Sequence, residues 1–142
     1  MAKKVAVVYW SGTGNTEIMA KAIAEGIQAA GAEAELMGPS DFGPDKMNAY
    51  GAFAFGCPAM GAEELEETEF APMFDSIEGS LAGKQVLLFG SYGWGDGEWM
   101  RAWADRTKGA GAFLVEDQGF MINNTPDADG EEQCREMGKK LA

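Results

Sequence analysis

Apolar and polar positions along this chain follow two different patterns. Short, almost wholly apolar runs such as "QVLLFGS" predict buried strands, whereas stretches with apolar side chains every three or four residues predict helices. The first helix predicted in this way follows the first strand and ends at Gly31. The predicted strands span residues 3–9, 32–37, 52–57, 85–91 and 112–122, and the predicted helices span 15–30, 66–76, 97–108 and 128–141, with a short helix near 45–50.

Short apolar strands that alternate with helices indicate βαβ units and therefore an α/β fold. We expect a doubly wound, five-stranded parallel sheet with helices on both faces, in a single domain spanning residues 1–142. In such sheets ligands bind beyond the carboxyl ends of the strands, where the strand order reverses. The loops after the first, third and fourth predicted strands are therefore the candidate site.

Composition excludes several classes of function. The chain has 142 residues and a net charge of −12, which argues against binding to nucleic acid or to an anionic membrane surface. It contains no histidine, so Ser–His and Cys–His catalysis are excluded. Its two cysteines, Cys57 and Cys134, have no metal-ligand spacing, and we expect free, mostly buried thiols. Without an apolar stretch long enough to cross a membrane, a cytoplasmic monomer is expected.

The loop "SGTGNT" after the first strand has the composition of an anion-binding turn without a cation. Its glycines allow a close approach to a ligand, its hydroxyls donate hydrogen bonds, and its amide donates or caps the following helix. A helix N-terminus adds about half a positive charge, which suits one terminal phosphate monoester. The residues of this loop are Ser11, Gly12, Thr13, Gly14, Asn15 and Thr16.

Other phosphate-binding motifs fit this loop less well. A P-loop requires a lysine, which is absent, and a dinucleotide-binding turn would place Glu17 where a glycine is needed for close helix packing. A phosphatase loop would need an arginine soon after Cys57, and none is present. A glycine-rich turn without a ligand remains the structural alternative.

The loops after the third and fourth strands offer two apolar surfaces for a flat ligand. Trp94 lies between Gly93 and Gly95, where a core role is hard to justify, so we interpret it as a stacking surface. Met60 supplies a soft, polarisable second wall on the other loop. A phosphate site at one end and an apolar sandwich at the other describe flavin mononucleotide (FMN).

Four segments together resemble the flavodoxins, specifically the short-chain clostridial type, over essentially the whole chain. This resemblance implies a sheet of order 2-1-3-4-5 and FMN as the cofactor. It also implies a low-potential one-electron carrier that uses the semiquinone/hydroquinone couple and is not itself an enzyme. The segments that carry the resemblance are "VYWSGTGNTE" (8–17), "GCPAMGAEELEE" (56–67), "LFGSYGWGDGEWM" (88–100) and "NTPD" (124–127).

The resemblance assigns roles around the flavin. Trp94 and Met60 would cover the two faces of the ring, and Glu63 would accept a hydrogen bond from flavin N3. A turn at residues 60–63 would turn the carbonyl of Gly61 toward flavin N5 on reduction, with strain at Ala62 in the oxidised form. Pro58 stands where some relatives carry a serine that reaches the phosphate. The remaining residues expected to contact FMN are Ala59, Ser91, Tyr92, Gly93, Gly95 and Asn124, besides residues 11–16.

Acidic residues crowd the loops that would surround the flavin. A docking face for basic redox partners, such as iron–sulfur oxidoreductases and reductases, is one interpretation, and a merely solvated rim is the other. A small FMN-dependent reductase of related fold is the alternative function, and a phosphate-binding module without redox activity is a further one. The acidic residues are Glu63, Glu64, Glu66, Glu67, Asp96 and Glu98.

Overall fold

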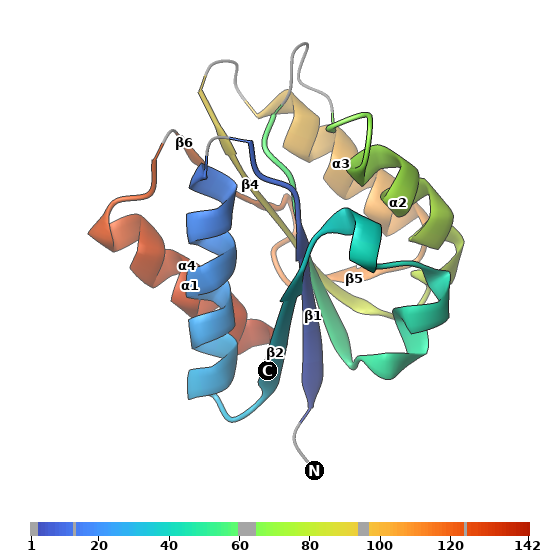
Figure 1. The fold of residues 1–142 in the computed structure, drawn as a ribbon, viewed down its shortest axis with the longest axis horizontal. Coiled ribbons are helices and arrows are strands. Elements are labelled where there is room, and N and C mark those ends of the chain that lie inside the picture. Colours follow the sequence, from blue (N-terminus) through green and yellow to red (C-terminus); the bar gives the residue numbers. More distant parts are fainter. Residues whose placement is uncertain (1–2, 13, 60–64, 94–96, 124) are drawn as a thin grey trace.

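The computed structural model describes residues 3–12, 14–59, 65–93, 97–123 and 125–142. Within them a parallel sheet lies between two layers of helices (Figure 1). The strands are β1 (Lys4–Tyr9), β2 (Glu33–Met37), β3 (Ala52–Gly56), β4 (Gln85–Tyr92), β5 (Phe113–Leu114) and β6 (Phe120–Asn123). The α-helices are α1 (Asn15–Ala29), α2 (Phe70–Ile77), α3 (Glu98–Gly109) and α4 (Ala128–Leu141). Three short 3₁₀ turns span Pro39–Asp41, Pro44–Ala49 and Glu78–Ser80.

The strand order β2-β1-β3-β4-β5, with every pairing between described strands parallel, confirms the predicted topology. The fifth position differs from the prediction because two short strands occupy it in place of one. Both pair with β4: Phe113 lies opposite Gln85 and Phe120 lies opposite Phe89. Between them the chain turns at Gly119, whose φ of +79° favours glycine. A Cβ at Gly119 would lie only 2.3 Å from the sulfur of Met100, so this turn packs closely on α3.

The two faces of the sheet carry different helices. Helices α1 and α4 cover one face, and α2 and α3 cover the other (Figure 1). The central strands β1, β3 and β4 are mostly buried, and residues Ala52–Gly56 are buried without exception, as expected for a parallel sheet covered on both faces.

Helices α1 and α4 approach each other through glycines. A Cβ at Gly26 would lie 1.9 Å from the carbonyl oxygen of Arg135, and a Cβ at Gly138 would lie 2.1 Å from that of Ile23. Neither position can hold a larger residue at this separation. The backbones of the two helices therefore touch directly.

Helix α2 begins at Phe70, four residues after the predicted start at Glu66. Glu66 is buried, with 4% of its surface exposed, and its carboxylate accepts hydrogen bonds from the backbone N–H groups of Thr68, Glu69 and Phe70. A carboxylate that binds the first N–H groups of a helix from outside ends the helix there. Glu66 therefore caps α2 from outside and does not belong to its first turn.

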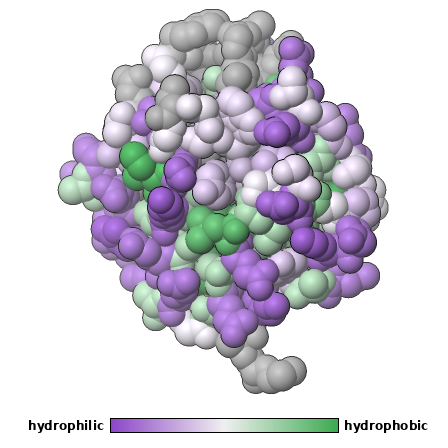
Figure 2. Space-filling model, in the orientation of Figure 1, coloured by the Kyte–Doolittle hydropathy of each residue, from purple (hydrophilic) through white to green (hydrophobic). Residues whose placement is uncertain are grey.

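The face shown in Figure 2 is mostly hydrophilic, with small apolar patches near its centre and toward its left side. Among the described residues, the large hydrophobic side chains that are exposed are Leu36 and Phe113. Isolated apolar side chains of this kind are ordinary on a protein surface. No helix in the described part of the chain is both long and apolar enough to cross a membrane.

Candidate functional site

The loops that follow β1, β3 and β4 leave the sheet side by side. Tyr9 lies opposite Gly56, and Gly56 lies opposite Phe89, so the three strands end at the same edge. Backbone hydrogen bonds continue the pairing beyond the strands: Trp10 N–H donates to Gly56 O at 3.0 Å, and Ala59 N–H donates to Ser91 O at 3.1 Å. The described parts of the three predicted site loops are therefore in contact.

Ser11 organises the loop between β1 and α1. Its hydroxyl oxygen accepts hydrogen bonds from Gly14 N–H at 3.0 Å and from Glu17 N–H at 3.4 Å. Because the oxygen already accepts two hydrogen bonds, the hydroxyl hydrogen of Ser11 is left to donate elsewhere. The serine thus folds the loop and still offers a donor at the helix terminus.

The N-cap residue of helix α1 has no side chain to cap it, and the only side-chain acceptor at this end among the described residues is Ser11, which accepts from Glu17 N–H at 3.4 Å. Gly14 is its N-cap residue, with a φ of +97° that favours glycine. The sequence suggested Asn15 as a possible cap, but Asn15 is the first helical residue. Its side-chain oxygen accepts instead from the hydroxyl of Thr125 at 3.0 Å. The N-terminus of a 15-residue helix is therefore open to an external acceptor.

A buried hydroxyl pair joins the first loop to the end of β4. The hydroxyls of Thr16 and Ser91 lie 3.2 Å apart, and the two residues are only 1% and 4% exposed. Gly12 lies against the ring of Trp10, since a Cβ on it would lie 3.0 Å from the nearest ring carbon. The structure therefore brings together six of the predicted site residues: Ser11, Gly12, Gly14, Asn15, Thr16 and Ser91.

The loop after β3 begins at Cys57, which is fully buried, and continues through Pro58 and Ala59, which are half-buried. Burial raises the pKa of the Cys57 thiol to about 12, so it stays protonated. Cys57 and Cys134 are both free and buried, as predicted. Neither is a reactive thiolate.

The loop after β4 begins at Tyr92, which is half-buried, and Gly93, which is exposed. The Tyr92 ring lies 5.8 Å from that of Trp99, and the Tyr92 carbonyl accepts a hydrogen bond from the side chain of Asn123 at 3.2 Å. Asn123 was not among the residues predicted from the sequence. Its neighbour Asn124 was, but the pairing of β6 with β4 places Asn123 opposite Tyr92.

The comparisons with known proteins agree with this geometry. The family model described as "Flavodoxin" matches residues 7–138. The flavodoxin of Clostridium beijerinckii is 47% identical over 136 residues, which cover 96% of this chain and 97% of that protein. The chain belongs to the flavodoxin family. It is therefore an electron carrier that binds FMN.

A solved structure and a longer flavoprotein show the same similarity to flavodoxins. The solution structure of two-electron reduced flavodoxin from Megasphaera elsdenii superposes with a TM-score of 0.86 at 47% identity, covering 96% of each chain. A putative diflavin flavoprotein of Thermosynechococcus vestitus is 34% identical over 98% of this chain, but only 24% of that larger protein is covered. The flavodoxin fold thus occurs both alone and as part of longer proteins.

The donor groups of the first loop fit the phosphate of FMN. Hydroxyls, one amide and the N–H groups of a helix N-terminus are neutral donors, and they satisfy a phosphate monoester without a metal ion. No lysine or arginine occurs in residues 8–17 or 88–100. Several predicted site residues lie outside the described residues, and their roles stay predictions: Thr13, Met60, Gly61, Ala62, Glu63, Trp94, Gly95 and Asn124.

The predicted acidic rim of this flavodoxin needs one correction. Glu66 is buried and caps α2, so it cannot contact a docking partner. Burial opposes its ionisation, but hydrogen bonds from Thr68, Phe70 and Glu69 lower the pKa of its carboxyl below the usual range. Glu67 and Glu98 are exposed, as expected. Glu63, Glu64 and Asp96 lie outside the described residues.

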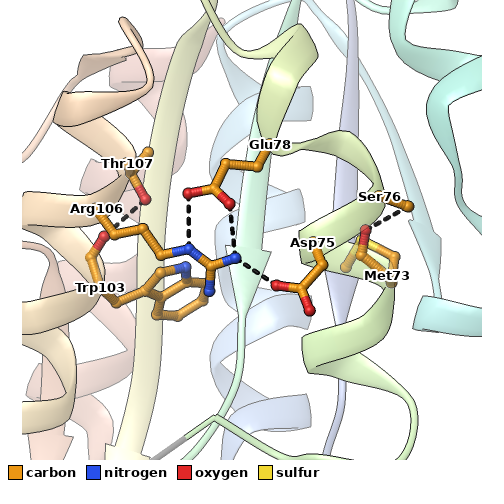
Figure 3. Close-up of polar contacts among 7 residues, drawn as sticks. All are labelled: Met73, Asp75, Ser76, Glu78, Trp103, Arg106 and Thr107. Carbon is orange, nitrogen blue, oxygen red and sulfur yellow. Dashed lines mark hydrogen bonds and ion pairs between the residues drawn. The ribbon is translucent and has the colours of Figure 1, made fainter.

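Helices α2 and α3, which follow the second and third site loops, are joined by Arg106. Figure 3 shows its guanidinium between Glu78 and Asp75, with hydrogen bonds of 2.7 and 2.8 Å to Glu78 and 2.5 Å to Asp75. It also lies 4.9 Å from the centre of the Phe74 ring. These carboxylates raise the pKa of Arg106, and Arg106 lowers that of Glu78. Sequence reasoning missed this cluster, because its members lie 28 and 31 residues apart.

Proposed function

We propose that residues 1–142 form a single FMN-binding domain that carries electrons one at a time at low potential between redox proteins. When bound, FMN supplies the ring that accepts and releases electrons, and the protein binds it, orients it and sets its surroundings. The near-complete overlap with the flavodoxin of Clostridium beijerinckii supports this proposal, because little chain is left for a substrate site.

The observation that carries the proposal is the loop between β1 and α1. It combines a helix N-terminus with a glycine as its N-cap residue, the hydroxyl hydrogen of Ser11, and Thr16, whose hydroxyl lies against that of Ser91 at the end of β4. Neutral donors at a helix terminus bind one phosphate well, and they leave its negative charge largely uncompensated. The site therefore favours FMN over a nucleotide with several phosphates.

A low potential follows from the charges around the site. The protein has a net charge of −12, and the described rim residues Glu67 and Glu98 are exposed acids. Each further negative charge on the flavin is then added next to the phosphate and without a basic side chain in residues 8–17 or 88–100. Such surroundings disfavour full reduction.

We assign the residues outside the described ranges as the resemblance suggests. Trp94 and Met60 cover the faces of the flavin ring, Glu63 accepts from flavin N3, and Asn124 lies near the ribityl chain. The turn that contains Gly61 and Ala62 presents a backbone carbonyl to flavin N5. Tyr92, Gly93 and Gly95 border the pyrimidine end, and Pro58 and Ala59 lead into the turn.

The proposed partners are redox proteins with basic docking faces, because the exposed acids would attract them. Glu67→Gln together with Glu98→Gln should slow electron transfer to a basic partner at low ionic strength and have little effect at high ionic strength, where charges are screened. Stopped-flow measurement at both ionic strengths tests this. An equal slowing at both would contradict electrostatic docking.

The alternative is a small FMN-dependent reductase. It stays an alternative because a segment similar to this chain also occurs within a longer diflavin flavoprotein. Anaerobic reductive titration of the purified protein with visible spectroscopy separates the two. A carrier should accumulate a distinct one-electron-reduced spectrum before full bleaching. Bleaching in one two-electron step, coupled to oxidation of a nicotinamide cofactor, would support the reductase.

A matched pair of serine variants tests the phosphate site itself. Ser11→Ala removes the donor and should weaken FMN binding about tenfold, as expected for a lost hydrogen bond to a charged group. Ser80→Ala removes an exposed serine in the 3₁₀ turn Glu78–Ser80 and should leave binding unchanged. Fluorescence titration with FMN gives both values. Unchanged binding in Ser11→Ala would contradict the assignment.

A further inference from the structure

A hydrogen bond between two side chains joins the first residue of α1 to the segment that precedes α4. The hydroxyl of Thr125 donates to the side-chain oxygen of Asn15 at 3.0 Å, although 110 positions separate the two residues in the sequence. Asn15 is half-buried and Thr125 is exposed. Thr125 was not among the residues predicted to contact FMN. We call this contact the Thr125–Asn15 bond.

The backbone that carries Thr125 is held in place by the residues around it. Pro126 is buried, and a proline restricts the backbone of the residue before it. The carboxylate of Asp127 accepts from Gly130 N–H at 2.7 Å and so caps α4. A Cβ at Gly130 would lie 3.2 Å from the Ile122 side chain, so α4 starts close against β6. Because α4 also packs directly on α1, the Thr125 hydroxyl reaches Asn15 from a fixed direction.

The amide of Asn15 can face a ligand in two ways. Its nitrogen donates hydrogen bonds and its oxygen only accepts them, and a half-turn about the terminal torsion exchanges the two. The side chain leans toward the open end of α1, because Cα–Cβ bonds in a helix tilt toward the N-terminus. Thr125 engages the oxygen, and no described residue accepts a hydrogen bond from the nitrogen. The nitrogen is therefore the group left for a ligand.

A phosphate at this helix end distinguishes the two orientations of the amide. Its oxygens accept hydrogen bonds from the amide nitrogen, whereas they repel the amide oxygen. Residues 8–17 contain no lysine or arginine whose charge would offset a wrongly placed oxygen. The orientation of Asn15 therefore matters more here than it would in a loop with a cation.

We propose that Thr125 is a positioning residue for the phosphate of FMN, because its hydroxyl holds the Asn15 amide with the nitrogen toward the phosphate. This inference rests on the proposed function. Without the hydroxyl, several orientations of the amide share the population, so a smaller fraction of the protein is competent to bind and the apparent affinity falls by that fraction. The effect acts through Asn15, with no contact between Thr125 and FMN.

The experiment uses FMN and riboflavin, which has the same ring and ribityl chain but no phosphate. Both affinities are measured by fluorescence titration in wild type, Thr125→Val, Thr125→Ser, Asn15→Ala and the double variant of Thr125→Val with Asn15→Ala. Thr125→Val should weaken FMN binding by about two- to fivefold, the size expected when a few side-chain orientations share the population, and leave riboflavin binding unchanged. Thr125→Ser keeps the hydroxyl and should bind FMN like wild type.

The double variant tests whether Thr125 acts through Asn15. Asn15→Ala should weaken FMN binding by about tenfold, as expected for a lost hydrogen bond to a charged group. In protein that already carries Asn15→Ala, Thr125→Val should have no further effect, because the amide that it orients is gone.

A control variant separates positioning from a general loss of stability. The buried Thr107 hydroxyl, in α3, donates to Trp103 O at 2.7 Å, so Thr107→Val also removes one hydroxyl and its hydrogen bond. It should lower stability in urea unfolding and yet keep the wild-type ratio of FMN affinity to riboflavin affinity. Thr125→Val should change that ratio.

Three results would overturn the inference and leave the proposed function intact. They are an unchanged FMN affinity in Thr125→Val, an equal weakening of FMN and riboflavin binding in that variant, and the same loss of FMN affinity from Thr125→Val whether or not Asn15 is present. An FMN affinity that Asn15→Ala does not change would overturn it as well. A wild-type protein that takes up no FMN would overturn the proposed function, and this inference with it.

Discussion

In this flavodoxin the two helices of each layer contact each other in a different way. Helices α1 and α4 meet through glycines, with backbone against backbone at Gly26 and Gly138. Helices α2 and α3 meet through side chains, where Phe70 and Phe74 pack edge-on against Trp103, at 5.4 and 5.6 Å between ring centres, and Arg106 bridges the two helices.

The two helix pairs adjoin different parts of the proposed site. Helix α1 begins at the loop that we assign to the phosphate, and its backbone contact leaves no room for movement toward α4. Helices α2 and α3 follow the loops that we assign to the flavin ring, and long side chains join them. Backbone contact therefore supports the phosphate side of the proposed site, and side-chain packing supports the ring side.

The largest expected effect comes from breaking the glycine contact. Gly26→Ala would place a Cβ 1.9 Å from Arg135 O, so α1 and α4 have to separate, and we expect a loss of about 3 kcal/mol in the free energy of unfolding. Gly109→Ala, in α3, has no neighbour within 4 Å and should instead stabilise the protein by about 0.5 kcal/mol. Urea unfolding measures both, and comparable destabilisation would show that helical glycine, and not the contact, matters.

An intermediate effect is expected at the cap of α2. Glu66→Gln removes a buried carboxylate that accepts several hydrogen bonds, and should cost about 2 kcal/mol at neutral pH. Because the pKa of Glu66 is lowered in the folded state, its stabilisation is present above the usual value of 4.5 and is lost as pH falls through the lower, folded pKa. Unfolding at pH 7 and pH 3 should show the difference between the two proteins shrinking in acid. A gap that persists or widens in acid would contradict this account.

The smallest effect distinguishes two arginines of similar exposure. Arg106, 33% exposed, bridges α2 and α3 and contacts Phe74, whereas Arg135, 34% exposed, joins Glu25 and Glu132 over a layer already closed by glycines. Arg106→Met should cost about 1 kcal/mol, less in high salt, and Arg135→Met should cost clearly less than that. Thermal unfolding at two salt concentrations compares them. Equal losses would mean that both are ordinary surface ion pairs.

Hydrophobic pattern predicted the strands and most helices to within two residues, because burial on both faces gives nearly continuous apolar runs. The pattern failed at the start of α2 and in the fifth strand. The start of α2 is set by the Glu66 side chain, which accepts a hydrogen bond from Phe70 N–H. The spacing of apolar residues does not reveal such a contact. In the fifth strand, the break depends on Gly119 packing against Met100 of a distant helix.

The site was predictable where its chemistry is local. The loop from Ser11 to Thr16 is a continuous segment, so its hydroxyls and glycines are visible in the sequence. The contact of Glu66 N–H with the Cys57 sulfur and the Arg106 bridge were not visible, because each joins residues that only the folded chain brings together. The sequence identified Cys57 only as a buried thiol and Glu66 only as a surface acid.

The way β4 is paired has a consequence for folding during synthesis. One edge of β4 pairs with β3, but the other is covered only by β5 and β6, which come late in the chain. All pairings between the described strands are parallel, so none forms from a local hairpin. Until residues 113–123 emerge from the ribosome, the apolar strand β4 has an unpaired edge. The growing chain therefore exposes an edge open to aggregation until residues 113–123 have been made.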